Sequence, residues 1–506
     1  MQPYSLGQLS LLCAELLNQL YGEVIGEVGL YLLRRGNRTL KDIHSSTNLK
    51  LADVKNALAV MVQNNLVKFE GTTVPQYSAI PENIYRLLRY PKYMWNMKKR
   101  LGESTAEELI IEAIVANGQI SASNAIFLAA KKLKDLEEEA KAKNPSAQLA
   151  SLKDKFKNLA ALGYILRCPR VTEEAHDTGN PETSQMVPIF ETEWREDVPE
   201  VDWNLIAKQL NHARLGDHSD SNILWRVNFD SFDNDMRHSI LVNAVAKRTG
   251  DPRAALLYNE LLKLWTARTH PDSYKSAEDS SNFMIKEGDA GCGQYLINYS
   301  KVFESLACAT LDSIVLEKFG SRALRIFRMT RFRHFTEQDP MQESSMIPPK
   351  EAKLVTYKLL ERNFLQIKEL KKGTGNSSGP VKSFILFQVD LQQVARTVLE
   401  TTYKGILNVL VRKDHVINVN RLLLEKNVRM EAILNSMEQS QVMEEDLEEF
   451  KNFLTPSEKI SLQKYHEMME RLILGAAQVD QSILILETFL KFSFVEAPKP
   501  KEKGRK

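Results

Sequence analysis

Cysteine is scarce in this 506-residue sequence, and its spacing excludes the common zinc sites. The four cysteines are Cys13, Cys168, Cys292 and Cys308, and none stands in a C-x-x-C pair. Four cysteines in so long a chain also do not make the dense disulfide framework of a small secreted domain. We therefore expect a protein of a reducing compartment.

Long apolar runs and net charge are also absent. No apolar run approaches about 18 residues, so we expect no membrane span and no membrane partner. The start MQPYSLGQLS lacks the charged segment and apolar core of a signal peptide. Lys+Arg 67 against Asp+Glu 65 gives a net charge of +2, which excludes a histone-like polybasic protein and a strongly acidic chaperone. Any charged partner must be met by local patches.

Motifs for chemistry are missing as well. The glycines of EGDAGCG at 287–293 do not form a phosphate-binding loop, and the 9 histidines show no ligand spacing. Asp230, Asp233 and Asp235 fit neither an EF-hand loop nor a polymerase aspartate triad. Acids just before a helix commonly cap it against its dipole, and we favour that role over a metal site. We expect no catalytic residue, no metal and no cofactor.

Glycine and proline are few, which points to helix. The chain has Gly 22 and Pro 18, with 43% hydrophobic and 26% charged residues, close to the globular average. This composition predicts a mostly α-helical chain that is long enough for about three to five domains.

A short pattern recurs along the chain. In residues 39–70 apolar residues follow helical spacing, the pair Asn64-Asn65 ends the helix, and residues 66–69 form a strand. Helix, turn, helix and then a hairpin strand is the winged-helix order. Residues 155–165 and 353–365 end in the same way, at Gly163 and Asn363. A third copy combines a helix at 232–249 with a hairpin at 282–298, and the loop at 373–380 belongs to the last wing.

The C-terminal region has the longest regular pattern. Residues 455–458, Thr-Pro-Ser-Glu, predict a capped helix start. The apolar residues that follow alternate steps of three and four, as in a coiled-coil seam. This seam comprises Leu462, Met469, Leu472, Val479, Ile483, Leu486 and Leu490, together with Tyr465 and Ala476. We expect it to pair with the helix at 396–437 as an antiparallel hairpin; the alternative is an ordinary core helix.

The predicted fold is mostly α with small β wings: four tandem winged-helix modules followed by a C-terminal antiparallel coiled-coil hairpin. The expected boundaries are winged helix 1 at 1–95, winged helix 2 at 96–170, an acidic linker at 171–222, winged helix 3 at 223–300, winged helix 4 at 301–395, the hairpin at 396–495 and a basic tail at 496–506.

Two basic stretches are candidate nucleic-acid contacts. The first comprises Arg86, Arg89, Lys92, Lys98, Lys99 and Arg100, interleaved with aromatic residues. These cations could neutralise phosphates while the rings stack on bases, or the segment could pack between modules with its cations at the surface. The second comprises Arg322, Arg325 and Arg328 on one helical face. Few acids interleave there, which favours phosphates or an acidic partner over a solvated face.

Several longer stretches together resemble one family. They are YGEVIGEVGLYLLRRG at 21–36, DVKNALAVMVQNNLV at 53–67, LLRYPKY at 87–93, EGDAGCGQYLIN at 287–298, LEKFGSRALRIFRM at 316–329, IPPKEAKLVTYKLLERNF at 347–364 and NRLLLEKNVRMEAILNSM at 420–437. Their order resembles the winged-helix subunit called C-three of DNA-directed RNA polymerase III, which is related to the alpha subunit of TFIIE. One departure is the short segment 266–282, where the family has a recognition helix, so the third module is expected to be incomplete.

The resemblance implies a non-catalytic subunit in the nucleus. The family implies a peripheral heterotrimer with two other polymerase III subunits, docked on the polymerase core. It also implies a role in initiation and promoter opening, a link to a TFIIIB-type factor, and weak, non-specific DNA contact, in the synthesis of tRNA, 5S rRNA and other small RNAs. The alternative is a winged-helix scaffold of a proteasome-lid or cullin-type assembly. The order of modules argues against it, because those scaffolds place helical repeats before a single terminal winged helix.

Overall fold

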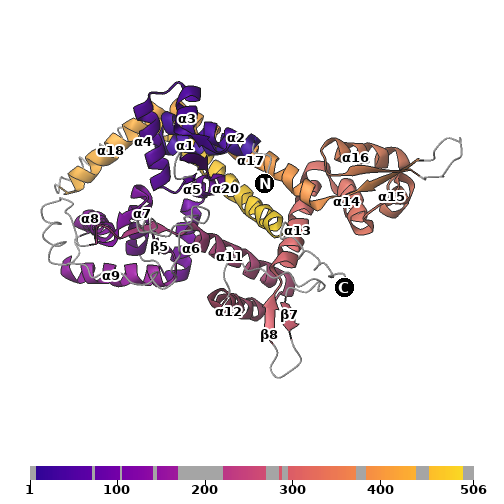
Figure 1. Cartoon of the computed structure of the whole chain (residues 1–506), viewed down its shortest axis with the longest axis horizontal. Coiled ribbons are helices and arrows are strands. Elements are labelled where there is room, and N and C mark those ends of the chain that lie inside the picture. Colours follow the sequence, from indigo (N-terminus) through magenta and orange to yellow (C-terminus); the bar gives the residue numbers. More distant parts are fainter. Residues whose placement is uncertain are drawn as a thin grey trace, which may run out of the picture. The chain divides into compact units, whose positions relative to one another are not determined.

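The computed structural model describes residues 7–70, 75–102, 105–140, 145–168, 220–268, 284–287, 294–371, 383–439 and 455–493. The chain divides into two compact units. One comprises residues 13–256, and the other residues 1–12 together with residues 257–506. Figure 1 shows the elements in chain order.

The first module has the winged-helix order that the sequence predicts. Its elements are α1 (Gly7–Tyr21), α2 (Glu23–Arg35), β1 (Arg38–Thr39), α3 (Leu40–Thr47), α4 (Leu51–Gln63), β2 (Val67–Glu70) and β3 (Gln76–Ala79). The strands form an antiparallel sheet in the order β1-β3-β2. A capping box starts α3, because Thr39 and Asp42 each accept from the other's backbone N–H. The helices and wing of this module are confirmed.

The core of this module depends on close approach of its first two helices. Leu17, Leu32, Ile43, Val54 and Met61 are at most 1% exposed. On α2, a Cβ atom at Gly29 would lie 2.4 Å from Leu17 Cδ1. A larger residue at this position would force Leu17 to shift within the core, so the close packing of α1 on α2 favours glycine in the segment YGEVIGEVG.

The second module takes one wing strand from far along the chain. Its elements are α5 (Pro81–Leu88), α6 (Tyr90–Leu101), α7 (Thr105–Asn117), β4 (Ile120–Ser121), α8 (Ala122–Ala140), α9 (Pro145–Ala161), β5 (Ile165–Arg167) and β6 (Leu224–Val227), followed by α11 (Phe229–Thr249). The sheet order is β4-β6-β5. In its core, Trp225 of β6 is fully buried, and its ring packs edge-on against that of Phe156 of α9, with 5.4 Å between the ring centroids.

The predicted boundaries at 170 and 223 are corrected by this pairing. Strand β6, which the sequence analysis assigned to the third module, pairs with β4 and β5 of the second. The acidic segment therefore separates two strands of one wing and does not separate two modules. Its residues 171–219 lie outside the described part of the chain.

The recurring helix ends share one backbone conformation. Asn65, Gly163 and Asn363 have φ angles of 55°, 76° and 60°. The left-handed region favours glycine and tolerates asparagine, which is why these residue types end the helices that lead into the wings. The repeated ending read from the sequence is confirmed in physical terms.

Downstream of α11 lie the third hairpin and the fourth winged helix. The elements are α12 (Pro252–Arg268), β7 (Met284–Glu287), β8 (Gln294–Ile297), α13 (Tyr299–Phe319), α14 (Ser321–Arg333), α15 (Gln338–Ser345), α16 (Pro349–Glu361), β9 (Gln366–Lys371) and β10 (Ser383–Gln388). Strands β7 and β8 pair as predicted, and so do β9 and β10. A bridge between Thr336 and Phe387 gives the last wing a minimal third strand. Residues 269–283, the site of the shortened segment, and the wing loop at 373–380 lie outside the described residues.

Within the described residues, three long helices follow the last wing. They are α17 (Leu391–Val419), α18 (Arg421–Gln439) and α20 (Pro456–Ser493), and α17 and α20 lie side by side (Figure 1). The predicted capping box forms, because Thr455 N–H donates to Glu458 at 2.9 Å and Glu458 N–H donates to Thr455 Oγ1 at 3.4 Å. The Tyr403 hydroxyl donates to Glu487 at 2.6 Å, and Lys426 Nζ donates to Glu458 at 2.9 Å. These contacts run in opposite chain directions, so the hairpin is antiparallel.

The seam of α20 changes character along its length. Leu462, Met469, Leu472 and Val479 are half-buried, whereas Ile483, Leu486 and Leu490 are buried. In the last part Leu484, Ile485 and Phe489 are buried too, because this half contacts both α13 and α17. The first half of α20 is thus a one-sided hairpin helix. The second half is an ordinary core helix, which is the alternative that the sequence left open.

Helix α20 is also long and apolar enough to cross a membrane, by length and composition alone. One 18-residue window has a mean hydropathy of 1.3, and 39% of that window is buried. The window includes the charged residues Asp480 and Glu487, so it is not the uninterrupted apolar run whose absence was noted in the sequence. Buried packing against α13 and α17 is a sufficient reason for the apolar character of its C-terminal half.

Candidate functional site

The first basic stretch lies on α5 and α6, and its arginines meet the aspartates at the start of α11. Arg86 Nε donates to Asp233 Oδ2 at 2.9 Å, and Arg86 Nη2 donates to Asp230 Oδ1 at 2.6 Å. The Tyr93 hydroxyl donates to Asp233 Oδ1 at 2.6 Å. The buried guanidinium of Arg89 is 3.9 Å from the same carboxylate and stacks over a tyrosine ring. Two arginines and a tyrosine therefore surround one buried aspartate.

The electrostatics of Asp233 explain how a buried charge is tolerated. Burial raises the pKa of this carboxyl, but the positive charges of Arg86 and Arg89 outweigh burial, so the pKa lies below its ordinary value. For Arg86, burial acts to lower the pKa, and the charges of Asp233 and Asp230 more than reverse this effect. In each ion pair, the attraction between the opposite charges offsets the free-energy cost of removing both from water.

A second part of the same network surrounds Asp235. Arg100 forms an ion pair with Asp235 and donates to the Tyr164 hydroxyl at 3.1 Å, while Tyr164 itself donates to Asp235. Burial, followed by the charge of Asp235, raises the pKa of Tyr164. Close by, burial lowers the pKa of His238 to about 4, so this imidazole is neutral at physiological pH.

This network corrects the role predicted for the three aspartates. The cap of α11 is Asn228, whose side chain accepts from the backbone N–H of Asp230. Asp230 lies in the first turn of α11, where a carboxylate suits the helix dipole, but all three aspartates are also counter-ions that tie α11 to α5, to α6 and to Tyr164, which follows α9. Asp230 and Asp233 share Arg86, Arg89 adds a second cation beside Asp233, and Asp235 pairs with Arg100.

Two of the three lysines of the stretch, Lys98 and Lys99, contact residues outside this network. Lys98 pairs with Glu108 at 2.6 Å. Lys92 is half-buried, whereas Lys99 is exposed and lies 5.5 Å from the Trp95 ring. Trp95 is 61% exposed. An exposed cation beside an exposed indole is the part of this stretch that keeps the geometry of a base-stacking surface.

The second basic stretch lies on α14, and it too has counter-ions. Arg322 pairs with Glu351 of α16, and Arg328 Nε donates to Asp312 of α13 at 2.8 Å. Arg325 Nη1 donates to the carbonyl of Ser345 at 3.2 Å. Few acids stand between the arginines in the sequence, but Glu351 and Asp312 reach them from neighbouring helices. All three arginines remain exposed, and the Arg322–Glu351 pair is solvated and weak. The Asp312 carboxylate is buried, however, and it also accepts from Arg331 at 2.8 Å, so Arg328 meets a more strongly held counter-ion.

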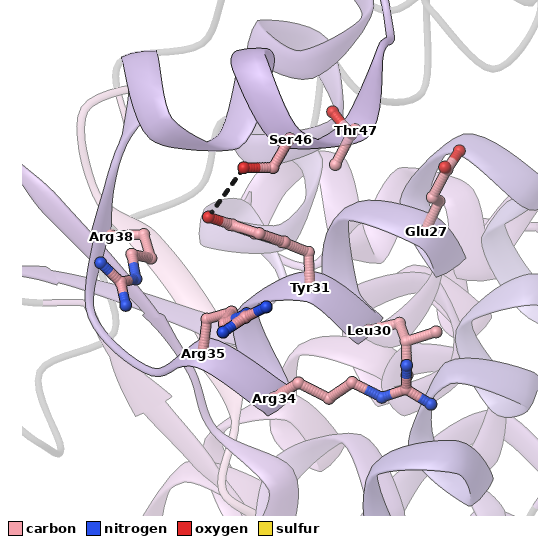
Figure 2. A pocket seen from close by; sticks show the side chains of 8 residues that line it. All are labelled: Glu27, Leu30, Tyr31, Arg34, Arg35, Arg38, Ser46 and Thr47. Atoms are coloured by element: carbon pink, nitrogen blue, oxygen red, sulfur yellow. Dashed lines mark hydrogen bonds between the residues drawn. The ribbon is translucent and has the colours of Figure 1, made fainter.

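A third group of basic residues was not predicted from the sequence. Arg34 and Arg35 end α2, and Arg38 begins β1 after a turn at Gly36, whose φ is 73°. The three side chains line an open pocket of about 510 Å³, with Glu27, Leu30, Tyr31, Ser46 and Thr47 as the other lining residues (Figure 2). We name this the arginine pocket. The signal was present as the run LRRGNR, which has three arginines and no acid.

The walls of the arginine pocket come from α2 and α3. The Ser46 hydroxyl donates to the Tyr31 hydroxyl at 3.1 Å across the two helices, as Figure 2 shows. Cations in the last turn of α2 interact favourably with the helix dipole, which gives Arg34 and Arg35 a local reason to be there. All three arginines are exposed.

In the part of the chain that the structure describes, no group of three His, Cys, Asp or Glu side chains is placed to hold a metal ion. The described cysteines Cys13, Cys168 and Cys308 are not disulfide-bonded. Burial raises the pKa of the Cys168 and Cys308 thiols, which makes them less reactive as thiolates. Cys292 lies outside the described residues.

Four family models match the chain, in the order of its modules. The RNA polymerase III subunit RPC82 helix-turn-helix domain matches residues 11–70, and the RNA polymerase III subunit RPC82 model matches residues 125–279. The C-terminal winged-helix domain of POLR3C matches residues 311–389. The helical hairpin domain of DNA-directed RNA polymerase III subunit RPC3 matches residues 422–485.

Relatives match over nearly the whole length. DNA-directed RNA polymerase III subunit RPC3 of Homo sapiens is 31% identical, over 95% of this chain and 98% of its own length. The RPC3 subunit of Danio rerio is 29% identical, over 95% and 97% of the two chains. That of Dictyostelium discoideum is 22% identical over 46% of this chain and 40% of its own. With the modules and the terminal hairpin in the same order, this chain belongs to the RPC3 family of DNA-directed RNA polymerase III subunits.

Proposed function

We propose that this chain is a non-catalytic scaffold subunit of RNA polymerase III in the nucleus. The observation that carries the proposal is the full-length match to polymerase III RPC3 subunits, over 95% of this chain. The described fold agrees with a scaffold, because its titratable clusters are arginine–aspartate networks that hold helices together. Catalytic magnesium belongs to another subunit of the enzyme in this proposal.

The proposed partners are the polymerase III core and two further subunits of a peripheral heterotrimer. In that trimer the chain aids promoter opening and links the enzyme to a TFIIIB-type initiation factor, for the transcription of tRNA, 5S rRNA and other small RNA genes. Its contact with DNA is weak and non-specific. The exposed arginines of α14 and the Lys99–Trp95 pair are its proposed contacts, whereas Arg86, Arg89 and Arg100 serve the internal network.

The test is identification of the proteins that co-purify with the tagged full-length chain, combined with depletion from a nuclear extract. We expect polymerase III subunits in the purified complex. We also expect loss of promoter-dependent tRNA gene transcription, restored by adding back the complex. Co-purification of proteasome-lid or cullin components without polymerase subunits would overturn the proposal in favour of the other scaffold class.

A further inference from the structure

We propose that the arginine pocket of the first winged helix binds an acidic protein segment, through carboxylates held by Arg34, Arg35 and Arg38. The proposal goes beyond membership of the polymerase, because it assigns a ligand chemistry to one module. It is also tested on the purified chain alone, so its failure and that of the proposed function are distinguishable.

The pocket arginines differ from other arginines of the fold in their counter-ions. Within the described residues, none of the three pocket arginines forms an ion pair with a carboxylate. By contrast, several arginines elsewhere in the fold meet acids from neighbouring helices, as Arg86 meets Asp233 and Arg322 meets Glu351. Three like charges brought together without neutralisation repel one another, and an external anion relieves this repulsion.

The side chains of the pocket fit carboxylates. A guanidinium presents a planar fork of N–H donors that matches a carboxylate with two parallel hydrogen bonds. The basic residues that line the pocket are all arginines. The Tyr31 hydroxyl accepts from Ser46, so its own proton can be donated to a bound anion. The half-buried Leu30 and Tyr31 provide an apolar wall that strengthens such hydrogen bonds.

The shape of the pocket favours an acidic protein segment over nucleic acid as its ligand. A nucleic-acid backbone needs a basic track that meets successive phosphates. The arginine pocket is compact, and Glu27 is among its lining residues, so its positive charge is confined to the three arginines. The pocket is built from α2, β1 and α3, with no lining residue from α4 or from the hairpin of β2 and β3. Discrete carboxylates therefore fit this pocket better than a continuous phosphate backbone.

The test measures binding of a fluorescein-labelled oligoglutamate peptide to the full-length chain by fluorescence anisotropy. The comparators are the matching oligoglutamine peptide, single-stranded DNA and duplex DNA. The variant is the triple change Arg34→Gln, Arg35→Gln and Arg38→Gln. Its matched control removes the same charge from the same module by Lys41→Gln, Lys50→Gln and Lys55→Gln, which are exposed residues outside the pocket. Circular dichroism melting of both variants shows that the module remains folded.

We expect the pocket variant to weaken oligoglutamate binding by about tenfold or more, and the control variant by less than about threefold. A second variant with lysine at the three positions keeps the positive charge but lacks the paired N–H donors of the guanidinium. It should bind oligoglutamate more tightly than the glutamine variant but less tightly than the wild-type chain. Equal losses in the pocket and control variants would overturn the proposal, because the effect would then be one of net charge. Loss of DNA binding with unchanged peptide binding would overturn it in favour of nucleic acid.

Discussion

The clearest prediction concerns Asp233, which shares Arg86 with Asp230 but differs from it in burial. The Asp233 side chain is 4% exposed, whereas that of Asp230 is 70% exposed. Asp233→Asn keeps the shape of the side chain and an oxygen that accepts from Tyr93. It removes the counter-charge of Arg89, whose side chain is 3% exposed. Breaking one partner of a buried pair costs about 3–5 kcal/mol, because the other charge is left buried without compensation.

Hydrogen exchange at the amides of α6 and α11 in the full-length chain measures this cost locally. A cost of about 3–5 kcal/mol corresponds to roughly a hundredfold to several-thousandfold faster exchange by opening of these helices. The control Asp230→Asn removes an exposed pair and should cost at most about 1 kcal/mol. Exchange in α17 and α20, which belong to the other unit, should not change. Equal and small effects of the two substitutions would refute the interpretation of Asp233 as the centre of a buried network.

The sign of the pH dependence follows from the lowered pKa of Asp233. Its contribution to stability is complete above the ordinary aspartate pKa and is lost as the pH falls through that value toward the lowered pKa. The difference between the wild-type chain and Asp233→Asn should therefore shrink only at acid pH. A difference that stays constant through that acid window would contradict the assignment of the charge.

Three further predictions test other parts of the molecule. Replacing Arg322, Arg325 and Arg328 of α14 with glutamine in the assembled complex should reduce the slope of log binding constant for DNA against log salt concentration by about 0.9 for each phosphate that is no longer neutralised. An unchanged slope would show that these arginines lie on a solvated face and do not contact DNA. On α20, Ile483→Ala removes a fully buried side chain and should destabilise the pair of α17 and α20 by about 2–5 kcal/mol, whereas Leu472→Ala at a half-buried position should cost less. Hydrogen exchange of α17 and α20 compares the two variants, and equal destabilisation would contradict the change in burial along α20. Because burial lowers the pKa of His238 from 6.5 to about 4, unit 13–256 should lose stability as the pH falls between these values, and His238→Asn should remove that loss in acid melting curves.

Local features were readable in the sequence because they act within one or two turns of helix. The asparagine and glycine helix ends, the capping box of Thr455 and Glu458 and the apolar spacing of α4 each depend on neighbours a few positions away. The order of modules followed from repeating these local signals. The same locality explains the error in domain boundaries, because nothing near residues 224–227 indicates that this strand pairs back onto β4 and β5.

The sequence by itself determined the element types, the winged-helix order and the terminal hairpin of this protein. Only the tertiary structure decided which charged residues are neutralised and which remain available. Arg86 and Asp233 are 147 positions apart, and α14 meets acids of α13 and α16, so counting acids beside arginines gave the wrong picture. The physical reason is that the free energy of an ion pair depends on distance and burial in space, which the packing of separate helices sets. By the same packing, Arg34, Arg35 and Arg38 gather around one pocket with no described carboxylate paired to them.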